Sequence, residues 1–197
     1  MLYLKFTIQD ASKFADFQQL FAYMVMLRQP GFTHEEDDIH INWDNLTEDE
    51  IQVQLNILID FENEDPAYRR YKKVIPPYAD TFFKQYLQEE MQQKSPVENE
   101  AVLPIFNYLE YGFEVDMDKL EQIDAHTGVV AFSTGNYPFG GIERFMMTLK
   151  AYDLGPVEGF DGFNIVQFEW LDPYTYNTVN LPEKTEAYIA KFKSADS

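Results

Sequence analysis

The sequence predicts an α+β protein, built mainly from antiparallel sheet with helices on one face. Residues 2–8 alternate apolar and polar side chains, which is typical of a strand with one buried face. Residues 14–27 carry large apolar side chains at helical spacing, and Pro30 with Gly31 ends that pattern. Strand-like and helix-like segments alternate again over residues 127–193. One-sided strands together with long amphipathic helices favour this fold class.

A second strand is predicted at 39–43, and the segment after it allows two interpretations. Thr47 and Glu50 have the spacing of a helix capping box, whereas six apolar and mostly β-branched side chains alternate strictly along 51–61. A helix would scatter those six side chains around its circumference. We therefore interpret 51–61 as a strand.

Prolines mark two helices between residues 65 and 93. Asp65 is a good N-cap, and Pro66 stands where proline is favoured in a first helical turn. Pro76 and Pro77 end this helix and begin the next, whose aromatic side chains share one broad face.

A polar stretch at 88–100 is the best candidate for a linker. We therefore expect an α+β half at 1–95, which contains an acidic segment at 35–65, and a second half at 96–197. One continuous domain is the alternative. The second half is predicted to contain strands at 108–115, 127–134 and 163–170, a short helix or turn at 116–124, and helices at 140–152 and 182–193.

The two halves show a similar spacing of elements. Phe6 and Ile41 are 35 residues apart, and Phe132 and Phe168 are 36 residues apart. Two ferredoxin-like, βαβ-containing halves would produce this spacing, and so would chance.

Composition excludes several classes of function. The 197 residues include 34 Asp and Glu against 15 Lys and Arg, which gives a net charge of −19. The chain has no cysteine, so disulfides, thiolate nucleophiles, cysteine-bound zinc and iron–sulfur clusters are absent. No signal peptide or apolar run long enough to span a membrane is present. We expect a cytoplasmic protein without a membrane partner.

The acidic segment 35–65 is the strongest feature for partner binding. It holds twelve carboxylates and no Lys or Arg, and its field would steer a basic protein. The basic run at 69–73, interleaved with aromatics, is expected to neutralise this segment, because the net charge opposes nucleic-acid binding. The predicted partner-binding residues are Glu35, Glu36, Asp37, Asp38, Glu48, Asp49 and Glu50.

The junction between the predicted strand 127–134 and the helix after it is the most site-like place in the chain. Glycines before a helix offer backbone N–H groups to an anion, although a tight turn needs glycines too. The spacing matches neither a P-loop nor a dinucleotide fingerprint, so no cofactor is expected. The predicted ligand-binding residues are Thr134, Gly135, Asn136, Gly140, Gly141 and Arg144.

Two further clusters gather possible metal ligands. One is the run from His34 to His40, and the other is Glu114, Asp116 and Asp118 with His126 downstream. Neither matches a known metal motif, and a solvated loop or a helix cap explains each of them, so no metal site is predicted. No Ser-His-Asp arrangement can be assembled, and no catalytic residues are assigned.

These observations favour a non-enzymatic interaction or inhibitor module for a basic partner, either immunity-like or a nucleic-acid mimic. The alternative is a small-molecule- or metal-binding enzyme that uses the Gly135–Gly141 loop and nearby carboxylates. The oligomeric state is left open.

Overall fold

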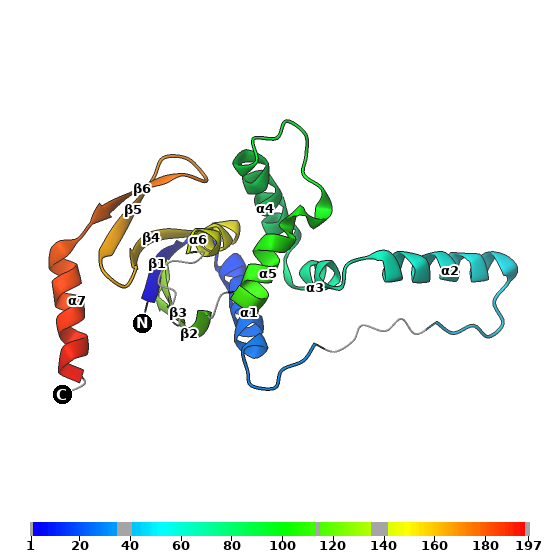
Figure 1. The fold of residues 1–197 in the computed structure, drawn as a ribbon, viewed down its shortest axis with the longest axis horizontal. Coiled ribbons are helices and arrows are strands. Elements are labelled where there is room, and N and C mark those ends of the chain that lie inside the picture. The colour runs from blue at the N-terminus through cyan, green and yellow to red at the C-terminus, as the bar shows by residue number, and fades with distance from the viewer. Residues whose placement is uncertain (1, 35–40, 113–114, 135–141, 196–197) are drawn as a thin grey trace.

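The computed structural model describes residues 2–34, 41–112, 115–134 and 142–195. Within these ranges, six antiparallel strands form one sheet in the order β2-β3-β1-β4-β5-β6. The described residues also form seven α-helices (Figure 1), which confirms the α+β class. The strands are β1 (Leu2–Ile8), β2 (Val115–Asp124), β3 (Thr127–Thr134), β4 (Leu154–Phe160), β5 (Ile165–Trp170) and β6 (Tyr176–Asn180).

Strand β1 lies in the middle of the sheet, and its side chains point alternately to the two faces. Leu2, Leu4, Phe6 and Ile8 are buried on one face, as the alternation predicts, and the side chains between them are only partly buried. Among the described residues of 1–95, this strand alone belongs to the sheet, and it lies between β3 and β4 of the second half. The two predicted halves therefore share one sheet.

Helices α1 (Ala11–Leu27) and α6 (Ile142–Ala151) cover the face of β1 that carries Phe6. The rings of Phe6 and Phe17 lie 6.4 Å apart, and the ring of Phe145 is 5.6 Å from that of Phe132. These aromatic contacts, with the aliphatic side chains around them, form the core between helices and sheet.

Helix α7 (Pro182–Ala195) packs on the opposite face of the sheet. Its Tyr188 contacts Phe160, with ring centroids 4.8 Å apart, and Tyr3, at 5.3 Å. Tyr3 and Phe160 are paired across β1 and β4, on the face away from Phe6. Helices therefore lie on both faces, and the expectation of helices on one face alone is too simple.

A helical insertion separates α1 from β2. It consists of α2 (Glu48–Asn63), α3 (Pro66–Val74), α4 (Pro77–Glu90), the 3₁₀ turn η1 (Asn99–Val102) and α5 (Leu103–Tyr111). Buried side chains join α3, α4 and α5 to the core, among them Tyr71, Phe83 and Phe106. Helix α2 extends away from the rest of the molecule (Figure 1).

Three of the predicted elements are wrong. Residues 51–61 belong to helix α2, residues 108–111 end helix α5, and residues 116–124 form most of strand β2. The predicted strand at 39–43 is not formed at 41–43, and its first two residues lie outside the described residues. The helices after Asp65 and Pro76 and the strand at 127–134 are confirmed.

Candidate functional site

The predicted ligand-binding junction is described only at its two ends. Thr134 is the last residue of β3, and Arg144 lies in α6. The Arg144 Nη1 donates to the Pro104 carbonyl at 3.3 Å and so links α6 to the start of α5. Gly135, Asn136, Gly140 and Gly141 lie outside the described residues. This site stays a prediction.

The structure describes three of the seven predicted partner-binding acids. Glu48, Asp49 and Glu50 form the first turn of α2 and are exposed. Hydrogen bonds from Thr47 lower the pKa of Glu50, whose Oε2 accepts from the Thr47 amide at 2.7 Å. The capping box predicted from Thr47 and Glu50 is therefore formed. The three acids lie at the positive end of the helix dipole, where a negative charge stabilises the helix. Glu35, Glu36, Asp37 and Asp38 lie outside the described residues.

Helix α2 has a surface that sequence analysis did not anticipate. None of its 16 residues is buried, although apolar side chains cover roughly two thirds of its circumference at 100° per residue. Between 37% and 55% of the surface of each of five large aliphatic side chains is exposed. These five, which we name the α2 apolar surface, are Ile51, Val53, Leu55, Ile57 and Ile59.

A narrow polar strip completes the circumference of α2. Gln52, Asn56 and Asp60 follow one another at four-residue spacing, and the Gln52 Nε2 donates to the Asn56 Oδ1 at 3.0 Å. The helix contains five Asp and Glu residues and no Lys or Arg. Helix α2 therefore presents apolar and negatively charged groups together.

The basic run 69–73 holds the end of α2 in place. The Arg69 Nη1 donates to the carbonyls of Phe61 and Glu64, both at 2.7 Å, and the guanidinium lies 3.9 Å from the centroid of the Phe61 ring. Lys72 forms an ion pair with Glu64 at 2.6 Å. The Lys72–Glu64 pair sets a base of this run against an acid of the segment 35–65, whereas Arg69 binds backbone carbonyls.

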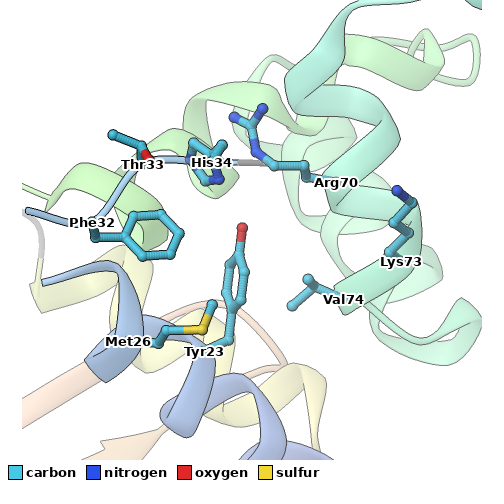
Figure 2. A pocket seen from close by; sticks show the side chains of 8 residues that line it. All are labelled: Tyr23, Met26, Phe32, Thr33, His34, Arg70, Lys73 and Val74. Carbon is cyan, nitrogen blue, oxygen red and sulfur yellow. The ribbon is translucent and has the colours of Figure 1, made fainter. Parts of the chain in front are cut away.

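A cavity of about 390 Å³ opens between α1 and α3, and we name it the α1–α3 cavity. Figure 2 shows its side chains arranged around the Tyr23 hydroxyl, which points toward His34 and Arg70. The lining residues are Tyr23 and Met26 of α1, Phe32, Thr33 and His34 of the segment after it, and Arg70, Lys73 and Val74 of α3.

A buried carboxylate stands behind this cavity. The Glu110 side chain is 0% exposed and accepts from the Arg70 Nε and Nη2, each at 2.8 Å, and from the Tyr23 hydroxyl at 2.5 Å. The hydrogen bond to Glu110 raises the pKa of Arg70. Burial, and then the same carboxylate, raise the pKa of Tyr23. Both shifts favour the protonated forms of these side chains.

His34 closes one side of the cavity. Its Nε2 lies 2.8 Å from the Tyr111 hydroxyl and 3.9 Å from the Glu110 Oε1. The rings of Phe32 and His34 meet edge to face, with centroids 5.1 Å apart. The segment after α1 is thus packed against the end of α5.

The residues of this cavity lie far apart in the chain, and the sequence did not predict that they meet. Arg70 and Lys73 were noted only as members of the basic run, and His34 only as a possible metal ligand. Tyr23 and Glu110 were not singled out. The one available signal is Glu110 itself, an acid within the otherwise uncharged helix 103–111.

The described residues include no group of three or more histidine, aspartate or glutamate side chains placed to hold a metal ion. Asp116 and Asp118 lie on the exposed strand β2, where Asp118 accepts from the Ser133 hydroxyl at 3.4 Å. Glu114 lies outside the described residues. Among the helices that the structure describes, none is both long and apolar enough to cross a membrane.

No protein-family model matches the chain, and neither a curated protein nor a solved structure is significantly similar to it.

Proposed function

We propose that the protein is a non-enzymatic binding module that docks helix α2 onto a basic partner protein. One observation carries this proposal: α2 extends from the molecule with an apolar surface that nothing in the described chain covers. An isolated helix of this length is marginal in water, and most helices are stabilised by burying an apolar face. A partner that covers the α2 apolar surface would supply that burial.

The charge of α2 specifies the chemistry of the partner. Five carboxylates lie on the helix without an opposing base on the same element. Complementary lysines and arginines on the partner would steer the encounter and fix its orientation. We therefore assign the partner an apolar groove with a basic rim, which is the mode in which amphipathic helices are commonly bound.

The apolar surface favours an immunity-like inhibitor over a nucleic-acid mimic. A mimic of a phosphate backbone needs charge at its contact surface, because phosphate contacts supply most of the affinity of nucleic-acid binders. Each aliphatic side chain of the α2 apolar surface could instead contribute about 1 kcal/mol in a groove, since roughly half of its area is still exposed. A second copy of the chain is a poor partner, since two acidic helices repel each other.

The experiment compares two double variants of α2. Leu55→Ser with Ile59→Ser removes part of the α2 apolar surface. The control, Gln52→Ser with Asn56→Ser, introduces the same two serines on the adjacent polar strip. Each purified protein is immobilised at low salt and used to capture proteins from a lysate of the source cells, with quantification by mass spectrometry. We expect a basic protein that binds the wild type and the polar-strip variant, and at least about tenfold less of it on the apolar variant.

Capture that is equal on all three proteins, or the absence of any basic protein that depends on α2, would overturn the proposal. Light scattering of the free protein tests whether a second copy of the chain covers the α2 apolar surface. A dimer that dissociates in the apolar variant would show that α2 binds a second copy of the chain instead. Circular dichroism establishes that all variants retain their fold.

A further inference from the structure

We propose that the α1–α3 cavity binds a small organic anion, whose carboxylate or phosphate group is held by Arg70 and whose apolar part lies against Phe32 and Met26. This site is separate from the α2 apolar surface, and its function does not depend on the proposed docking of α2. The inference rests on the charge, geometry and size of the cavity.

The charge of the cavity lining is opposite to that of the molecule. Acids outnumber bases by 34 to 15 in the chain, yet the described residues that line the cavity include two bases, Arg70 and Lys73, and no carboxylate. Glu110, which accepts from Arg70, lies behind this lining. A second cavity of about 610 Å³ lies between α4 and the β5–β6 turn, and the described residues that line it include Glu89, Glu90 and Asp172 but no base. Cationic groups in a cavity favour an anion over a cation or a neutral molecule.

The orientation of Arg70 supports the same ligand class. Glu110 accepts from the Nε and Nη2 of the guanidinium, and the Tyr23 hydroxyl points toward Arg70 from within the cavity. A guanidinium has five N–H donors, so three remain after the two bonds to Glu110. Because Glu110 fixes the head group in advance, little side-chain entropy is lost when an anion binds. Glu110 is therefore a positioning residue.

The remaining lining fits an anion with an apolar part. Phe32, Met26 and Val74 supply carbon surface, and Thr33 and His34 add polar groups from the segment after α1. The volume of about 390 Å³ lies within the usual range for small-molecule sites, which is roughly 300–1,000 Å³. An inorganic ion alone would leave most of this space unfilled. We therefore expect a ligand of the size of an aromatic or short aliphatic acid.

The test measures the binding of chosen probes to the full chain. Benzoate and phenyl phosphate are the organic anions, inorganic phosphate is the bare anion, and benzylamine is the cation of matched shape. Calorimetry and thermal shift report affinity, and changes in amide chemical shift locate the site. We expect saturable binding of an organic anion, with the largest shift changes at residues 23–34 and 70–74 and at least about tenfold weaker binding of benzylamine.

Two variants separate binding from folding. Arg70→Lys keeps a charge beside Glu110 but loses the bidentate fork, and should weaken organic-anion binding at least about tenfold. Arg70→Met with Glu110→Leu removes the buried pair together, which leaves no uncompensated charge, and should abolish binding in a folded protein. The charge-matched control is Lys119→Met, at an exposed ion pair on β2, which should change the dissociation constant less than about twofold.

The proposal is wrong if no organic anion binds, if Arg70→Lys binds as tightly as the wild type, or if benzylamine binds as tightly as benzoate. Inorganic phosphate that binds as tightly as phenyl phosphate would overturn the assignment of an apolar part to the ligand. Shift changes located around Arg144 instead would place the anion at the Gly135–Gly141 junction and contradict the α1–α3 cavity.

Discussion

Arg70 donates from Nε and Nη2 to the two carboxylate oxygens of Glu110, and both distances are 2.8 Å. The pair joins α3 to α5, and the hydroxyl of Tyr23 brings α1 to the same carboxylate. One fully buried acid therefore ties three helices together beside the α1–α3 cavity. Such an arrangement is costly to desolvate and is stable only while its partners remain complete.

The first prediction concerns this pair. Glu110→Gln retains the shape of the side chain but leaves Arg70 without its counter-charge, so the free energy of unfolding should fall by about 3 kcal/mol. Guanidinium denaturation followed by circular dichroism measures this loss. The double variant Arg70→Met with Glu110→Leu should lose less free energy of unfolding than Arg70→Met and Glu110→Leu lose together as single variants. Strictly additive losses would show that the two side chains contribute independently.

The second prediction concerns the end of α2. Because Arg69 satisfies two carbonyls at the C-terminus of this helix, Arg69→Met should leave them without that donor and loosen α2 locally. Hydrogen exchange of the α2 amides should become about five- to tenfold faster, which corresponds to about 1 kcal/mol, while the core amides change little. Lys72→Met is the control, since its ion pair with Glu64 is exposed. Equal acceleration in both variants would contradict a specific role for Arg69.

Helix α2 shows why hydrophobic periodicity misled the sequence analysis. Alternation along 51–61 is diagnostic of a strand only when one face is buried against a core, and here none of the residues of the helix is buried. The local signal from Thr47 and Glu50 was correct, because a capping box depends only on neighbouring residues. Alternation of apolar side chains therefore does not indicate a strand in an element that buries none of its residues.

The exchange of helix and strand around residues 108–124 has a different cause. Helix α5 has nine residues, about two and a half turns, and only its last four residues fall within the predicted strand 108–115. A segment this short does not show helical periodicity. Strand β2 lies at the edge of the sheet with mostly exposed side chains and therefore lacks the apolar alternation of β1. The strands β4 and β6 were missed altogether. By contrast, β1 and α1 were predicted well because each has one buried face.

The α1–α3 cavity could not be assembled from the sequence. Its two ends, Tyr23 and Val74, are 51 residues apart, and only the packing of α3 against α5 brings Arg70 to Glu110. The sequence did show that bases are concentrated at 69–73. It did not show that Arg69 and Lys72 face α2 while Arg70 and Lys73 face the cavity.

The third prediction concerns a close approach between β3 and β1. A Cβ atom added at Gly128 would overlap the Phe6 ring, which is fully buried in the core. Gly128→Ala should therefore lower the free energy of unfolding by about 1–3 kcal/mol through overpacking. Phe6→Leu in the same chain should recover part of this loss, although it is destabilising alone. A double variant that loses the full sum would show that the alanine is accommodated elsewhere.

The fourth prediction concerns alkaline stability and Tyr71. Burial, and then the hydrogen bond from its hydroxyl to the Asp80 Oδ1 at 2.8 Å, raise the pKa of Tyr71 in the folded state. Tyr71 is only 2% exposed, and the unfolded chain releases the same proton near pH 10. The folded state therefore binds more protons than the unfolded state above that pH. Its stability must fall as pH rises, since unfolding then releases a proton.

Burial also raises the pKa of Tyr86 and the pKa of Tyr108, each to about 12. These two side chains therefore also make the folded state less stable as pH rises above 10. Guanidinium unfolding measured at several pH values from about 8 to 11.5 should show a free energy of unfolding that declines above pH 10. Tyr71→Phe should make this decline shallower by about 1.4 kcal/mol per pH unit, the contribution of one proton. Asp80 keeps its ion pair with Lys84 at 2.9 Å in that variant, so its carboxylate is not left without a partner. An unchanged slope would show that Tyr71 ionises in the folded protein as readily as in the unfolded chain.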